Sequence, residues 1–220
     1  MKTVVTGTEM KDLDANTITN HHMPSLVLME RAALASVEVL ESENFNLDEI
    51  AIICGPGNNG GDGIAIGRLL HLRGHNVHIV VVGDSEKQTP ETRKQILIAT
   101  SYHAPITTFS SIKSHRKLTT IIDALFGIGA VRTPSGEFLD AITWINSHRQ
   151  AGTKVLAIDI PSGVSADTGQ TPGAAVQADA TVSFAFTKVG LTQEPGSTLA
   201  GIIVIKDIGI YQYLTKPNSS

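Results

Sequence analysis

The chain has 220 residues, with 17 Lys and Arg against 21 Asp and Glu, which gives a formal net charge of −4. This mild acidity offers no electrostatic reason to expect nucleic acid or an anionic membrane as a partner. Apolar residues make up 41% of the chain and charged residues 17%, so a sizeable core can form and intrinsic disorder is excluded. Cys54 is the single cysteine, which excludes a disulfide scaffold.

The length suits one large domain, and we expect a single domain over residues 1–220. The sequence has no run of eighteen apolar residues and no apolar segment of the signal-peptide type at its N-terminus. We therefore expect no membrane span and a cytoplasmic location. The polar tail Thr215–Ser220 is expected to fray.

Two helices are predicted before residue 46. Thr6 and Glu9 fit a capping box, so the first helix begins near them. The second helix begins around Pro24–Ser25. Its apolar residues fall three or four positions apart, on one face of a helix: Leu26, Met29, Ala33, Val37 and Leu40.

After Asn46, short apolar runs alternate with longer helical segments, which predicts a doubly wound α/β fold. Strands that are apolar throughout have both faces buried, as in a parallel sheet. The predicted strands are Ile50–Cys54, Val77–Val82, Ile106–Phe109 (the weakest), Thr119–Ile122, Lys154–Ile158, Ala180–Ala185 and Ile202–Ile205. The predicted helices between them are Gly63–Arg73, Pro90–Thr100 and Phe138–His148.

Polar residues and glycines follow several of these strands. In open parallel sheets, ligands bind beyond the carboxyl ends of the strands. The segment GPGNNGGDG, Gly55–Gly63, follows the first strand, and Asp123, Asp159 and Lys188 follow three later ones. We expect these residues to line a single crevice.

The glycine-rich segment fits the pattern G-x-G-x-x-G at Gly55, Gly57 and Gly60, between a strand and a helix. With Asp84 after the next strand, this pattern favours an NAD(P)-dependent oxidoreductase. Asp62 argues against that function, because a carboxylate at the entrance of the helix would repel a pyrophosphate. The segment suits a neutral polar group and a cation better, although a tight turn that needs glycine explains the same residues.

Three acidic residues in one crevice require compensation. With Asp62, Asp123 and Asp159 close together, either one carboxyl stays protonated or a cation lies among them. The amide of Asn59, the carboxylate of Asp123, the hydroxyl of Ser162 and loop carbonyls offer hard oxygen ligands, which favour a weakly charged ion over zinc or iron. An acid at a strand end can also be an ordinary helix cap.

Five sequence blocks, spread from about Thr8 to Ile210, resemble the YjeF N-terminal domain family, which contains the NAD(P)H-hydrate epimerases. The resemblance implies a Rossmann-like three-layer α/β/α sandwich with a mainly parallel sheet and N-terminal helices. It also implies an isomerase that interconverts the R and S epimers of hydrated NADH and NADPH. In chain order the blocks are GPGNNGGDG with Arg68 after it, DALFGIGAVR, DIPSGVSADTG, FAFTKVG and IKDIGI.

The resemblance also implies a set of site residues. One potassium ion per subunit would be held by Asn59, Asp123 and Ser162. The substrate would be contacted by Asn58, Asn59, Gly60, Gly61, Asp62, Gly127, Ile128, Gly129, Ala130, Val131, Arg132, Thr133 and Asp159.

The same resemblance suggests a homodimer. Many bacterial relatives carry a C-terminal dehydratase domain that this sequence lacks. We therefore expect it to epimerise without dehydrating, beside a separate NAD(P)H-hydrate dehydratase.

The chemistry of the substrate gives a hypothesis for the mechanism. Hydrated NADH carries a hydroxyl on C6 beside the ring nitrogen, so protonated hydroxyl can leave as water and return on the other face. We expect Asp159 to be the acid–base group, with Lys188 tuning it or orienting the water, and the ion fixing the loop geometry around Asp62 and Asp123. The alternative is a non-catalytic nucleotide- or protein-binding module of the same fold.

Overall fold

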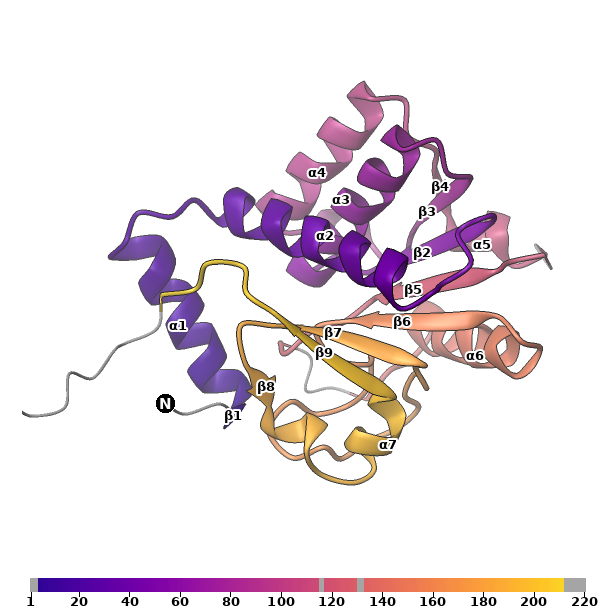
Figure 1. Ribbon diagram of the computed structural model, residues 1–220. Helices are drawn as coiled ribbons and strands as arrows, with labels where there is room; N and C mark the ends of the chain where they lie inside the picture. The colour runs from indigo at the N-terminus through magenta and orange to yellow at the C-terminus, as the bar shows by residue number, and fades with distance from the viewer. Residues whose placement is uncertain (1–3, 115–116, 130–132, 212–220) are drawn as a thin grey trace, which may run out of the picture.

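The computed structural model describes residues 4–114, 117–129 and 133–211, and the predicted fraying of residues 215–220 lies outside them. Its centre is a sheet of seven strands that are all parallel (Figure 1). The strands are β2 (Ile50–Cys54), β3 (Val77–Val81), β4 (Ile106–Thr108), β5 (Thr120–Ala124), β6 (Lys154–Ile158), β7 (Ala180–Phe184) and β9 (Ile202–Lys206).

The strand order across the sheet is β4-β3-β2-β5-β6-β7-β9. The chain moves outward from β2 to β4 and then returns to place β5 on the other side of β2. This reversal is the topological switch point of a doubly wound fold, where such sheets open a crevice at the carboxyl ends of the strands. The predicted α/β class with a parallel sheet is confirmed.

Helices cover both faces of the sheet and make it the middle of three layers. Within β2, Ile52 packs with Leu40 and Ile64 on one face, whereas Ile53 packs with Ile142 on the other. Figure 1 shows α2, α3 and α4 together on the first side, with α6 on the second. The helices of these layers are α2 (Ser25–Ser42), α3 (Asn58–Leu72), α4 (Pro90–Ser101), α5 (Phe109–Ile112) and α6 (Glu137–Gln150).

The N-terminal segment adds a two-stranded parallel ladder and a helix. β1 (Val4–Val5) pairs with β8 (Thr187–Lys188), strands too short for any periodicity to predict. The predicted capping box opens α1 (Gly7–Thr19), where the Glu9 amide donates to the Thr6 hydroxyl at 3.1 Å and the Thr6 amide to the Glu9 carboxylate at 2.8 Å. The remaining elements are η1 (Ser85–Lys87), η2 (Val189–Leu191) and α7 (Gly196–Ala200).

The predicted strand and helix ends agree with the structure to within two residues, with one exception. The helix predicted to begin at Gly63 begins at Asn58, so the expected NNGGD loop is helical. Glycine is a poor helix former in isolation, but close packing requires it here. A Cβ on Gly63 would lie 2.5 Å from the Ala124 side chain, and one on Gly67 would lie 2.4 Å from Ile79.

None of the helices in the described ranges is long and apolar enough to span a bilayer.

Candidate active site

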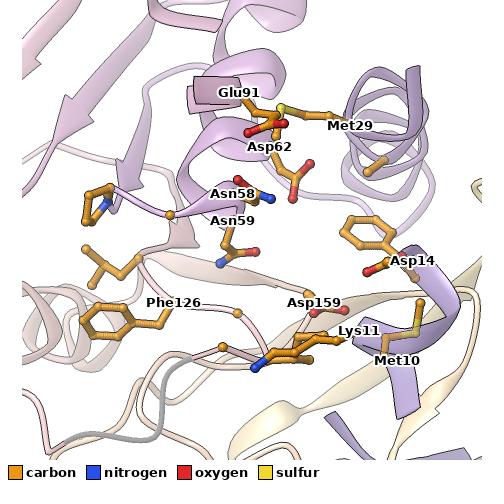
Figure 2. Close-up of a pocket in the computed structure, with 18 of the residues that line it drawn as sticks. Met10, Lys11, Asp14, Met29, Asn58, Asn59, Asp62, Glu91, Phe126 and Asp159 are labelled. Atoms are coloured by element: carbon orange, nitrogen blue, oxygen red, sulfur yellow. The ribbon is translucent and has the colours of Figure 1, made fainter. Parts of the chain in front are cut away.

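A cavity of about 1010 Å³ opens beyond the carboxyl ends of β2, β5 and β6 (Figure 2). It lies at the switch point, where a doubly wound sheet is expected to bind its ligand. Its walls come from five parts of the chain. They include Met10, Lys11 and Asp14 of α1, Leu28 and Met29 of α2, Asn58, Asn59 and Asp62 of α3, Leu125–Gly129 after β5, and Asp159 with Lys188.

The structure brings most of the predicted site residues to this cavity. Gly60, Gly61, Asp123 and Ser162 are buried without lining it. Ala130, Val131 and Arg132 lie outside the described residues. The predicted residues that do line it are Asn58, Asn59, Asp62, Gly127, Ile128, Gly129, Thr133, Asp159 and Lys188.

Gly60 and Gly61 bring α3 close to its neighbours. A Cβ on Gly60 would lie 1.8 Å from the carbonyl oxygen of Gly55, closer than any two such atoms can approach. A Cβ on Gly61 would lie 2.7 Å from the end of the Met29 side chain, on α2. Any substrate contact by these two residues stays a prediction, while their packing sets where Asn58, Asn59 and Asp62 lie.

Lys188 is a cation fixed at the bottom of the cavity. Its side chain is fully buried and its ammonium contacts the carboxylate of Asp159. The same ammonium donates to the hydroxyl of Ser183 and to the carbonyl of Phe184, both at 3.0 Å. Because an ammonium has three donors, these contacts occupy all of them. Lys188 is therefore held in one position against Asp159.

Asp159 occupies an unusual backbone conformation. Its φ is +70°, in the left-handed region that non-glycine residues seldom adopt, and the Ile160 amide donates to the carbonyl of Ile158 at 2.9 Å. The neighbouring strand β7 ends in the same way at Ala185, with φ +60°. Backbone strain of this kind, which costs about 1–3 kcal/mol per residue, concentrates at functional sites. Here it turns a carboxylate into the cavity directly at the end of β6.

Three carboxyl groups from different elements share the cavity. Figure 2 shows Asp14 of α1, Asp62 of α3 and Asp159 turned toward a common space. Burial, with Asp159 and Asp14 nearby, raises the pKa of Asp62 well above its ordinary value. Burial and the charge of Asp159 raise the pKa of Asp14 to about 6, although Lys188 opposes that rise. Proton transfer near neutral pH is therefore within reach of this group.

Asp14 was missed by the sequence analysis, which considered only residues after the strands. A signal was present in α1, where Met10, Asp14 and Ile18 follow one another at intervals of four and all line the cavity. Such residues share one helix face. An acid within an otherwise apolar stripe marks a buried carboxyl that needs a reason.

Asp123 lies apart from this group. It is fully buried, accepts hydrogen bonds from the Ser162 amide at 2.8 Å and the Ser162 hydroxyl at 2.6 Å, and is close enough to Cys54 to raise the pKa of that thiol. Burial raises the pKa of Asp123 to about 6 against the effect of these bonds. The expected crowding of Asp62, Asp123 and Asp159 is thus corrected, because Asp14 takes the third position.

Asn59 lies between the cavity and the Asp123–Ser162 pair. Its Nδ2 atom is buried and has no hydrogen-bond partner among the described residues. The carboxamide packs on Gly127, and the preceding Phe126 amide donates to the Ser162 hydroxyl at 2.9 Å. The segment after β5 thus joins the three residues predicted to hold an ion. Over residues 4–114, 117–129 and 133–211, no three His, Cys, Asp or Glu side chains form a metal site.

Comparisons with known proteins give a consistent result. The family model described as "YjeF-related protein N-terminus" matches residues 25–190. NAD(P)H-hydrate epimerases of Levilactobacillus brevis and Weissella koreensis are each 44% identical over 96% of this chain and cover 96% and 93% of their own lengths. That of Limosilactobacillus reuteri is 46% identical over 94% of this chain and 97% of its own. The crystal structure of yeast ynu0 (YNL200c), 19% identical, shares the fold with a TM-score of 0.78 over 98% of both chains.

Proposed function

The chain belongs to the family of YjeF-related protein N-termini, and from that premise we propose that it is an NAD(P)H-hydrate epimerase. This isomerase interconverts the R and S epimers of hydrated NADH and NADPH. The observation that carries the proposal is a switch-point cavity with acid–base groups in a chain 44–46% identical, over nearly its whole length, to epimerases. Fold likeness alone would not support an activity.

The reaction needs a group that can give and take a proton at the C6 hydroxyl of the hydrated ring. We assign this role to Asp159, which lines the cavity at the end of β6 and is held by the buried ammonium of Lys188. When the hydroxyl receives a proton, the lone pair of the ring nitrogen expels it as water and leaves a planar iminium. The return of water to the other face inverts the stereocentre.

The remaining walls fit the other parts of a nucleotide. Asn58, Asn59 and Asp62 lie on one side of the first turns of α3 and face the cavity. Their amide and carboxyl groups can hydrogen-bond a polar ring substituent such as the carboxamide. The segment from Gly127 to Thr133, part of which lies outside the described residues, is proposed to contact the rest of the nucleotide.

The residues present fit the potassium ion that the resemblance implies. The carboxylate of Asp123 is fully buried with only neutral donors on it, and Asn59 has an unpartnered amide atom beside it. The Ser162 hydroxyl, which donates to Asp123 and accepts from Phe126, retains an acceptor lone pair. A bound monovalent cation would supply the charge that neutralises this carboxylate. We propose Asn59, Asp123 and Ser162 as its ligands.

Some expectations belong to this proposal without a structural test. We propose that the chain acts as one domain, assembles as a homodimer, works in the cytoplasm and hands the epimers to a separate NAD(P)H-hydrate dehydratase. A size measurement in solution tests the dimer, and the two purified enzymes mixed with racemic hydrate test the last point.

The decisive experiment starts from the pure R hydrate of NADH. We expect the purified protein to bring R and S to equilibrium far faster than the spontaneous reaction, as followed by chiral chromatography. Replacement of potassium by a larger organic cation should slow the enzyme. A rate no faster than the spontaneous one would leave the non-catalytic binding module as the better interpretation.

A further inference from the structure

Inversion by loss and return of water involves both faces of the planar iminium. A single carboxyl lies on one side of a bound ring and can exchange protons with water on that side only. The proposed function therefore requires a second proton-transfer group on a different wall of the cavity. This requirement concerns geometry and does not depend on which hydrate the enzyme prefers.

We propose that Asp14 of α1 is this second group, acting on the ring face opposite to the one that Asp159 serves. Asp14 and Asp159 line the same cavity from different walls, and Figure 2 shows both carboxyl groups turned into it. A ring lying between the two walls presents one face to each. The unpartnered amide of Asn59, more than nine-tenths buried, independently marks this space as one that awaits a polar ligand.

The titratable neighbours favour Asp14 over Asp62 for this role. Asp62 shares its wall with Asn58 and Asn59, so it is placed to bind the ring substituent with them. Asp14 stands alone among the acids on α1, and its pKa of about 6 makes both protonation states available near neutral pH. The titratable residues that line the cavity with Asp14 are Lys11, Asp62, Lys87, Glu91, Asp159 and Lys188.

The two carboxyl groups exchange roles during each inversion. The protonated one gives its proton to the C6 hydroxyl, the C–O bond breaks and water leaves, while the nitrogen lone pair forms the C=N bond. Water then attacks C6 from the other face, the C=N electron pair returns to nitrogen, and the proton goes to the second carboxylate. The enzyme ends with its proton on the opposite wall, ready for the reverse reaction.

This inference rests on the proposed function and predicts a separable partial reaction. In water enriched in ¹⁸O, the wild-type protein should place label in both epimers. In Asp14→Asn, one of the two pure epimers should still exchange its hydroxyl for labelled water with retention, through Asp159 alone. Inversion should fall by about 10²-fold or more, the usual contribution of a positioned acid–base group. Chiral separation followed by mass spectrometry measures both quantities.

The matched control is Asp12→Asn, the same change at an exposed position of α1, which should leave both rates unchanged. Asp14→Asn that inverts within threefold of the wild-type rate overturns the role of Asp14. So does a folded Asp14→Asn that loses exchange from both epimers, or an Asp62→Asn that alone exchanges with retention. If Asp14→Asn fails to fold, Asp14→Ser replaces it. A wild-type protein without activity overturns the proposed function itself, and this inference with it.

Discussion

The cavity wall has two sides that use the same residue types in different ways. On the packed side, Asp123 and Ser162 hydrogen-bond to each other in full burial, and Gly60 lies against the backbone of Gly55. On the open side, Asp14 and Asp159 face the cavity. We call these residues the packed side and the open side.

The comparison teaches how to separate scaffold from chemistry among the acids of one site. The carboxylate of Asp123 receives three hydrogen bonds, from Ser162 twice and from the Leu125 amide, and is closed to the cavity. Asp159 has Lys188 on one side and the cavity on the other. Changes on the packed side should therefore cost stability, and changes on the open side should cost rate.

The largest effect is expected from Gly60→Ala on the packed side. The new Cβ would meet the carbonyl oxygen of Gly55 at 1.8 Å and its carbonyl carbon at 2.7 Å, and neither backbone atom can move without displacing α3 from β2. We expect no folded protein at 25 °C, as measured by circular dichroism and amide exchange. The control is Gly57→Ala, where nothing lies within 4 Å and φ is −81°, so the loss should stay within about 1 kcal/mol.

Folding of Gly60→Ala with near-normal stability would contradict the idea that the glycines of this segment serve packing. Their contact with substrate would then become the better explanation of the pattern.

The next effect is on the open side, at Asp159→Asn. Asparagine keeps the shape and can still accept from Lys188, but it cannot take a proton from water. We expect epimerisation to fall by about 10²–10⁴-fold, with binding of the hydrate retained. Stopped assays with chiral separation measure the rate, and calorimetry measures the binding. A rate close to that of the wild-type protein would remove Asp159 from the mechanism.

Much of this arrangement could be predicted from the sequence, because apolar runs and turn residues are local signals. The runs at Ile50–Cys54 and Lys154–Ile158 are strands with those same ends, and the polar residues after them meet at one edge of the sheet. The parallel order followed from strands that are apolar on both faces.

The parts that could not be predicted depend on contacts between distant segments. Propensity made NNGGD a loop, whereas the close approach of α3 to β2 and β3 makes it helical. The ladder between β1 and β8 involves two residues on each side and leaves no periodic pattern. Asp14 lies on α1, which reaches the cavity only through tertiary packing, so a rule about strand ends cannot find it.

A smaller effect is expected at Ser162→Ala on the packed side. The change removes the hydroxyl that donates to Asp123 at 2.6 Å and accepts from the Phe126 amide at 2.9 Å. Losing the partner of a buried polar group costs about 1–3 kcal/mol, so the free energy of unfolding should fall by that amount in urea titrations. Ser101→Ala, at an exposed helix end, should change it by no more than about 0.5 kcal/mol. An unchanged stability in Ser162→Ala would show that the packed side does not behave as a scaffold.

The smallest effect sharpens the comparison most, because it has the opposite sign. The pKa of Asp14 is about 6 in the folded protein against 3.8 as the ordinary value, so between about pH 4 and pH 6 the folded state binds more protons than the unfolded one. Wild-type stability therefore falls as pH rises through this range.

Asp14→Asn removes that contribution, while Asp62, Asp159 and Lys188 still face the position. The shift corresponds to at most about 3 kcal/mol, and partial solvent exposure reduces it, so we expect a gain on the order of 1 kcal/mol at pH 7–8. The gain should disappear below about pH 4, and Asp12→Asn should show none of it. Urea titrations across this pH range measure the difference. A loss of stability at pH 7 would place Asp14 on the packed side, whereas a gain with lost inversion is what an open-side residue kept for chemistry should give.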